Sequence, residues 1–73
     1  MKPIKFTSHE VIWLFNPLHV AHAGISYVPG KKKWVLFLFT DMGDGESHMN
    51  EWSYDSEVEC KRMLEYIEKC MSD

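Results

Sequence analysis

The sequence predicts an α+β fold: a small three-stranded antiparallel sheet with a C-terminal amphipathic helix and a short N-terminal helix. Two observations support this fold. Helix-start signals stand near both ends of the chain, at 7–10 and 56–59, and apolar segments separated by turn residues fill the middle. We expect a single domain over 1–73, because a chain of 73 residues has room for one hydrophobic core.

The short N-terminal helix is expected at residues 8–15. The segment 7–10, Thr-Ser-His-Glu, has the form of a capping box, and Phe6 and Val11 flank it as a hydrophobic staple would. The following segment, Val-Ile-Trp-Leu-Phe, is also typical of a strand, because β-branched and aromatic residues favour pleated backbone. Both states stay open, and the capping signal favours the helix.

The chain is expected to restart at Asn16-Pro17. Asn is a common helix cap and Pro suits the first helical position, so one or two further turns are expected over 17–23, with Gly24 as the stop.

Three strands are expected in the middle of the chain, at 25–28, 34–40 and 49–54. Pro29-Gly30 predicts the first turn, with the glycine supplying a positive φ, and 41–47 reads as a loop. The strand 34–39 is apolar on both sides, so both sheet faces need cover. Either the N-terminal segment or a protein partner covers the second face.

The C-terminal helix is expected at about 57–71. Ser56 and Glu59 form a capping box, and an apolar stripe recurs at helical spacing through Cys60, Leu64 and Ile67 to Met71. Acidic residues in the first turn and Lys69 in the last complement the helix dipole.

The charge of the chain is divided between its halves. Residues 1–40 carry five lysines against one glutamate, a net +4, whereas 41–73 carry ten acidic against three basic residues, a net −7. Such asymmetry favours a binding function, because surfaces of one sign steer partners of the other. A solvated turn and a solvated helix face are the simpler explanation of the same residues.

The two cysteines, Cys60 and Cys70, are expected to be free thiols. Ten residues on one helix separate them by about 15 Å, beyond the reach of a disulfide. Free thiols fit a reducing compartment, so we expect a cytoplasmic protein. No apolar run approaches the roughly 20 residues of a membrane-spanning helix, and the N-terminus lacks a signal-peptide core.

No motif nominates a catalytic or metal site, so we expect a non-enzymatic protein without cofactors. The cysteines and the four histidines lack zinc-site spacing, although His19 and His22 stand three residues apart. The acidic loop 41–46 lacks the ligand order of a calcium-binding loop. Nucleophile and phosphate-loop signatures are also missing from the sequence.

A basic patch beside an aromatic ring gives an alternative function, a nucleic-acid-binding module. Lysines can hold phosphates while a ring stacks on a base. The element order is similar to that of double-stranded-RNA-binding domains, but the second helix here starts with acidic rather than basic residues. The acidic residues gathered at 41–59 can steer the chain toward a basic protein, which favours a protein partner instead. The expected partner-binding residues are Lys31, Lys32, Lys33, Trp34, Glu51 and Trp52.

The whole chain, from Met-Lys-Pro-Ile-Lys-Phe at 1–6 to Glu-Lys-Cys-Met-Ser-Asp at 68–73, resembles small phage-encoded regulators of the host. Its size, free cysteines and lack of catalytic motifs agree with that class. It looks most like the RNA-polymerase-binding transcription regulators of lytic Xanthomonas phages. The resemblance implies binding to the N-terminal part of the β′ subunit, displacement of σ, blocked initiation and antitermination.

Overall fold

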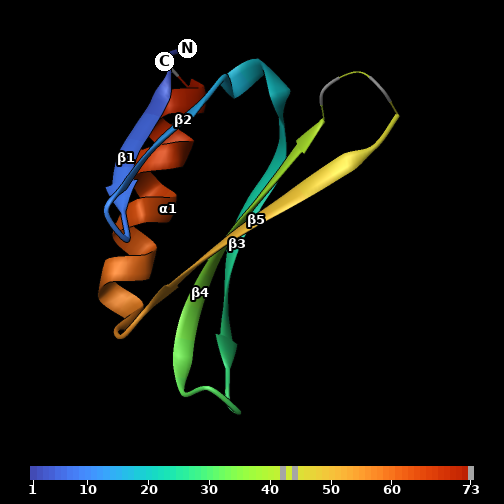
Figure 1. Cartoon of the computed structure of the whole chain (residues 1–73). Helices are drawn as coiled ribbons and strands as arrows, with labels where there is room; N and C mark the ends of the chain where they lie inside the picture. Colours follow the sequence, from blue (N-terminus) through green and yellow to red (C-terminus); the bar gives the residue numbers. More distant parts are fainter. Residues whose placement is uncertain (42, 44, 73) are drawn as a thin grey trace.

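The computed structural model describes residues 1–41, 43 and 45–72. Two antiparallel sheets and one helix make up the fold (Figure 1). The elements in chain order are β1 (Ile4–Ser8), β2 (Val11–Phe15), a 3-10 turn (Pro17–His19), β3 (Val20–Val28), β4 (Lys33–Asp41), β5 (Ser47–Tyr54) and α1 (Glu57–Ser72). The predicted α+β class, the three-stranded antiparallel sheet and the C-terminal helix are confirmed.

The prediction of a short helix at 8–15 is wrong, because these residues belong to a β-hairpin. β1 and β2 pair antiparallel, with Ser8 opposite Val11. The two loop residues, His9 and Glu10, have φ values of 53° and 65°, as a type I′ hairpin turn requires. The Ser8 hydroxyl bonds to His9 Nδ1 at 2.9 Å rather than capping a helix. The strand preference of the β-branched and aromatic residues in β2 therefore outweighs the apparent capping box.

In place of the one or two helical turns expected over 17–23, the chain forms a single 3-10 turn at Pro17–His19. The Asn16 side chain accepts a hydrogen bond from the Leu18 amide at 3.0 Å, and Pro17 takes an early helical position, as predicted. The turn ends at His19, and Gly24 lies inside β3 rather than ending a helix.

The second sheet has the strand order β3-β4-β5, so the apolar strand β4 is central. All three strands are antiparallel neighbours and extend beyond the predicted ranges. In the β3–β4 turn the positive φ, 53°, belongs to Lys32 and not to Gly30, which corrects the predicted role of that glycine. A register shift between Val20 and His22 marks a bulge in β3.

Helix α1 begins as its sequence predicts. The Ser56 hydroxyl accepts a hydrogen bond from the Glu59 amide at 3.2 Å, which is the capping bond of the motif. Glu57 and Lys61 form an ion pair at 3.0 Å one turn apart. Three residues of α1 are buried against the core: Cys60, Ile67 and Cys70.

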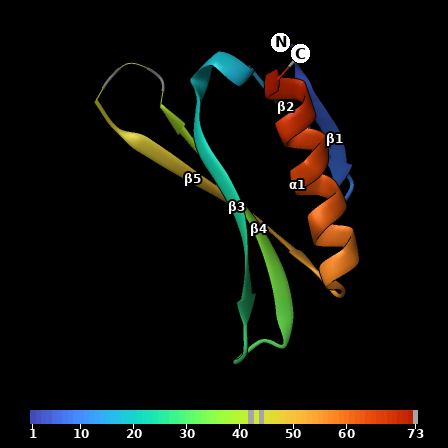
Figure 2. The same cartoon turned by 180° about the vertical axis from the view of Figure 1, so that it is seen from behind.

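The core lies between one face of the three-stranded sheet and a layer made by α1 and the hairpin (Figures 1 and 2). Trp52 of β5 is the hub on the hairpin side: Phe6, Trp13 and Phe15 meet its ring edge-to-face at centroid distances of 5.1, 5.2 and 5.8 Å. Such ring pairs contribute about 0.5–1.5 kcal/mol each beyond area burial. The buried cluster comprises Ile4, Leu36, Leu38, Trp52, Cys60, Ile67 and Cys70.

Two hydrogen-bonded contacts join the hairpin segment to the helix. The Lys2 amide donates to the Cys70 carbonyl at 3.0 Å. The Tyr66 hydroxyl accepts from the Lys5 amide at 3.0 Å and donates to the Lys5 carbonyl at 2.8 Å. The N-terminal segment is therefore packed on the same side of the sheet as α1. Among the described residues, no helix has the length and apolarity needed to cross a membrane.

The buried stripe of α1 predicts a large stability effect at Ile67, whose side chain is 0% exposed. Ile67→Ala should lower the free energy of unfolding by about 2–5 kcal/mol, because it leaves a cavity in the core. Urea denaturation followed by tryptophan fluorescence measures the change. Glu65→Ala, at an exposed position on the same helix, is the matched control and should change stability by less than about 0.5 kcal/mol. Equal effects of the two variants would contradict the assigned helix face.

The hairpin turn predicts an opposite effect at Glu10. An L-residue in left-handed conformation is strained by roughly 1–2 kcal/mol, which exceeds the entropic penalty of glycine, about 0.5–1 kcal/mol. Glu10→Gly should therefore stabilise the protein by about 0.5–1 kcal/mol. Thr7→Gly, inside β1, should destabilise it instead. Thermal unfolding of both variants checks the opposite signs, and a destabilised Glu10→Gly would rule out this turn.

Candidate functional site

The outer face of the three-stranded sheet is the main candidate site, because neither α1 nor the hairpin packs on it. Residues opposite one another in an antiparallel sheet share a face. Leu36 and Leu38 therefore lie on the inner face with the core, and Phe37 and Phe39 lie on the outer face. Of the two alternatives for covering this second face, the N-terminal segment does not cover it, because the hairpin packs on the inner face with α1. The partner alternative stays open.

A shallow groove of about 310 Å³ runs across this outer face. Its floor is formed by Val35, which is buried, and by the half-buried Phe37 and Phe39. Met49 of β5 lies at the side of the groove and is 53% exposed. The complete lining is Ser26, Val28, Val35, Phe37, Phe39, Met49 and Glu51, so Glu51 is the charged residue among mainly apolar neighbours.

The aromatic side chains on this face are ordered by contact with one another. The Phe37 and Phe39 rings meet edge-to-face at 5.8 Å, and His22 stacks on Phe39 at 4.3 Å with planes 24° apart. Phe37 lies directly over Gly24, where a Cβ atom would come within 2.6 Å of the ring. Gly24 therefore allows the ring to lie flat on the sheet. Reading Gly24 as a helix stop concealed this packing role.

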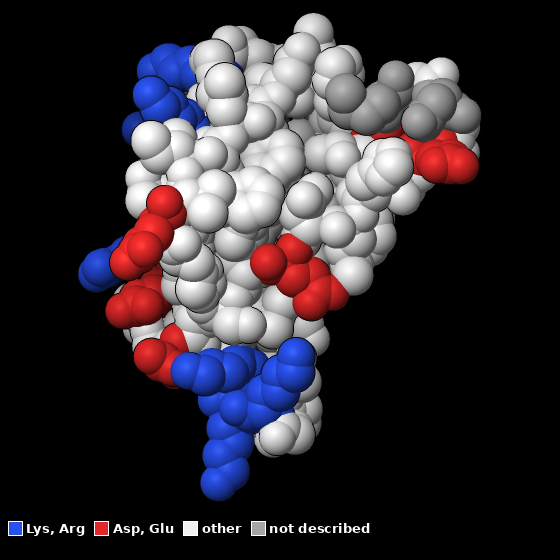
Figure 3. All heavy atoms as spheres, in the orientation of Figure 1, with Lys and Arg blue, Asp and Glu red and all other residues white. Residues whose placement is uncertain are grey.

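The Lys31–Lys33 turn lies at one end of the sheet, and Asp41 and Glu46 flank the loop at the other. Figure 3 shows the blue cluster at the β3–β4 turn, with red atoms beside it and at the far end of the sheet. Lys33 forms an ion pair with Asp55, and its hydrogen bond and positive charge lower the pKa of that carboxyl. Lys31 and Lys32 are exposed.

The six residues predicted to bind a partner do not form one surface. Trp34 points to the inner face, where its ring lies 5.3 Å from that of Tyr27 and packs against the core cluster. Trp52 is only 3% exposed, so a partner cannot contact it in this fold. Glu51 does line the groove. Sequence reasoning missed the outer aromatic residues because β4 is apolar on both faces.

The chemistry available elsewhere in the described residues is limited. No three His, Cys, Asp or Glu side chains in 1–41, 43 and 45–72 come together as a metal site. The acidic loop considered for calcium lies partly outside the described residues, at positions 42 and 44. Cys60 and Cys70 are both free and buried.

The Cys60 thiol is held in its unreactive form by burial, which raises its pKa. Because the thiolate is the nucleophile, a raised pKa lowers reactivity at neutral pH. Burial also raises the pKa of Tyr54, although a hydrogen bond from Ser8 opposes the shift.

Comparison with known proteins gave no match: no protein-family model, no curated protein and no solved structure matches this chain.

Burial of both thiols predicts slow alkylation of the native protein. At pH 8, iodoacetamide should modify Cys60 and Cys70 at least about tenfold more slowly than in urea, because the folded core excludes the reagent. Ser53→Cys, at an exposed position of β5, supplies the accessible control thiol in the same protein. Mass spectrometry of timed samples measures each site. If Cys60 and Cys70 in the folded protein react as fast as the thiol introduced by Ser53→Cys, they are not buried.

Proposed function

We propose that this chain is a small, non-enzymatic protein-binding regulator that docks through the outer face of its three-stranded sheet. The carrying observation is the groove over Val35, Phe37 and Phe39, an apolar surface at the centre of the sheet that no described element covers. Contiguous apolar patches on a small domain mark interaction sites, because leaving them in water is unfavourable.

A protein surface is the occupant that this face fits best. The aromatic rings and Met49 are residue types that are enriched at protein interfaces. The groove lining contains no lysine or arginine, and Glu51 would repel phosphate groups. The lysine turn and the acidic end would then orient the partner on this face. They favour a partner that has an apolar centre, with acidic residues facing the lysines and basic residues facing the acidic end.

The partner we propose is bacterial RNA polymerase, contacted at the N-terminal part of its β′ subunit. This choice rests on the resemblance of the whole chain to small transcription regulators of lytic Xanthomonas phages. Phage origin, action in the host bacterial cytoplasm, displacement of σ and antitermination belong to the same proposal. The outer sheet face supplies the contact surface that such an inhibitor needs.

The nucleic-acid alternative has less support. Lys31 and Lys32, the lysines that this function would use, are exposed at a turn. Trp34 packs toward the core rather than beside them. A stacking platform next to the lysines is therefore not formed by this ring. Binding by lysines alone would be weak and steeply dependent on salt.

The test is binding of purified Xanthomonas RNA polymerase to the labelled protein, followed by fluorescence anisotropy. Phe39→Ser combined with Met49→Ser should weaken binding at least about tenfold, because each removes apolar contact area from the groove. Glu65→Ser, on the exposed face of α1, is the control and should leave affinity unchanged.

Three results would count against the proposal. Failure of the wild-type chain to bind polymerase would remove the named partner. Unchanged affinity in the Phe39/Met49 double variant, with its fold verified by circular dichroism, would remove the outer face as the docking surface. Salt-dependent binding to RNA or DNA that disappears in Lys31→Glu with Lys32→Glu would favour the nucleic-acid function instead.

A further inference from the structure

Strand β2 combines an uncharged sequence with an exposed position. Its five residues, Val-Ile-Trp-Leu-Phe, carry no charge. Trp13 and Phe15 turn inward to the core, whereas Ile12 and Leu14 are 66% and 67% exposed. β2 is thus an apolar strand of a two-stranded sheet, with its outward side chains in water.

The backbone of β2 has an unused hydrogen-bonding edge, and two independent observations place it. Tyr66 bonds both the amide and the carbonyl of Lys5, so these groups point away from β2. Lys5 is opposite Leu14. When the backbone groups of one residue of an antiparallel pair point outward, those of its partner also point outward, on the other side of the hairpin. The two-residue turn makes Ser8 and Val11 a hydrogen-bonded pair. Because hydrogen-bonded and non-hydrogen-bonded pairs alternate along the hairpin, the backbone groups of Ile12 and Leu14 again point away from β1. The N–H and C=O groups of Ile12 and Leu14 therefore face outward.

The edge of β2 differs from the edges of β1 and β5. Tyr66 closes the edge of β1 at Lys5. β5 carries the charged Glu51. No backbone hydrogen bond joins the outer edge of β2 to another element within the described residues. Natural proteins shield sheet edges with charges, prolines or bulges, and β2 has none of them between its ends.

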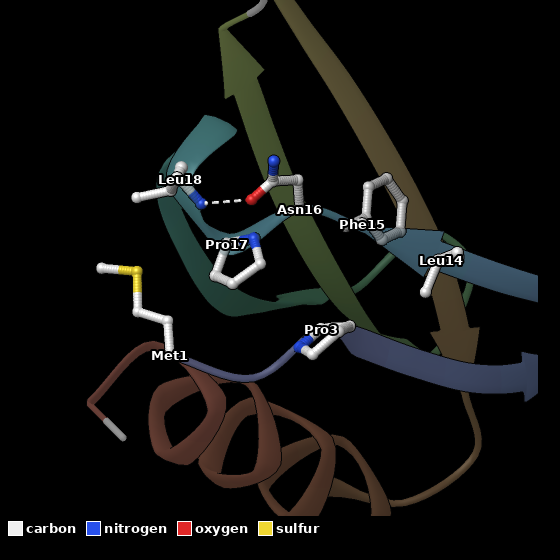
Figure 4. Close-up of a pocket in the computed structure, with 7 residues that line it drawn as sticks. All are labelled: Met1, Pro3, Leu14, Phe15, Asn16, Pro17 and Leu18. Carbon is white, nitrogen blue, oxygen red and sulfur yellow. Dashed lines mark hydrogen bonds between the residues drawn. The ribbon is translucent and has the colours of Figure 1, made fainter.

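A hollow of about 560 Å³ lies at the end of this edge. Met1 and Leu18 lie on one side and Leu14 on the other, with the rings of Pro3 and Pro17 between them (Figure 4). Met1 and Leu18 are 63% and 74% exposed. The hollow is therefore an apolar socket placed next to unpaired backbone groups.

We propose that the β2 edge binds an extended segment of a protein partner as an added strand, with an apolar side chain of that segment in the Met1–Leu18 hollow. Backbone hydrogen bonds to Ile12 and Leu14 would give affinity, and the hollow would select the side chain. This inference rests on the proposed protein-binding function, but it uses a surface separate from the outer sheet face.

A second copy of the chain fits this edge less well than a foreign segment. Antiparallel pairing of β2 with itself about Trp13 would place Leu14 opposite Ile12 of the other copy. The same register brings Glu10 and His9 of that copy against the hollow lined by 14–18. A carboxylate beside an apolar socket is unfavourable. The preferred ligand is instead uncharged and apolar at that end.

The experiment uses twelve-residue peptides selected against the full chain from a random displayed library. Selected peptides should lack proline at their centre and alternate apolar residues. Hydrogen exchange by NMR, on the wild-type protein, should show at least about tenfold slower exchange at the Ile12 and Leu14 amides with peptide bound. The Trp13 amide points to β1 and should not change.

Two variants at one position separate backbone from side-chain contacts. Ile12→Pro removes the outward amide at an edge position that accepts proline, and it should weaken peptide binding at least about tenfold. Ile12→Ala keeps the amide and should retain most of the affinity. Equal loss in both variants, or no protection at Ile12 and Leu14, would overturn strand addition.

The remaining outcomes distinguish this inference from the proposed function. Loss of peptide binding in the Phe39/Met49 double variant but not in Ile12→Pro would place the peptides on the outer face and overturn the β2 assignment. Protection of Ile12 that grows with protein concentration alone would assign the edge to a second copy and overturn the foreign segment. Peptide binding that persists when polymerase does not bind would remove the polymerase proposal and keep the edge site.

Discussion

The two-sided apolar character of β4 is the constraint on which the rest of this structure depends. Its inner residues, Leu36 and Leu38, need a cover, and α1 with the hairpin provides it. Its outer residues, Phe37 and Phe39, are just as apolar, but no further element packs on them within residues 1–41, 43 and 45–72. A central strand of this kind is normally covered on both faces. The exposed groove therefore follows from a central strand with two apolar faces, of which α1 and the hairpin cover one.

Aromatic packing, rather than backbone pairing, joins the two sheets. The hairpin has no strand-to-strand hydrogen bonds to β3, β4 or β5 among the described residues. Its contact with that sheet therefore depends on the rings around Trp52, while its hydrogen bonds go to α1. The indole N–H groups of Trp13 and Trp52 are buried and have no hydrogen-bond partner among the residues that the structure describes. The apolar contacts have to offset that desolvation. This mode of attachment uses the inward side chains of β2 and leaves its backbone edge free.

The sequence predicted those parts of the fold in which local signals and long-range packing agree. Ser56 starts α1 as expected, because its cap is followed by a stripe that the sheet buries. At residues 7–10 the same type of motif misled, because the next five residues favour a strand and the turn uses His9 and Glu10 instead of Asn or Gly. The site was harder still. Glu51 and Trp52 are neighbours in sequence, yet strand alternation puts one in the groove and the other in the core.

The open surfaces of this protein impose a geometry on any partner. The hairpin lies on the inner side of the three-stranded sheet with α1, so the groove and the β2 edge belong to different layers. A rigid convex partner can fill the groove but cannot also add a strand to β2. A partner with a mobile extended segment can do both, and the second contact then forms at high effective concentration. Two moderate surfaces on a chain of 73 residues can thereby give tight binding without a large continuous interface.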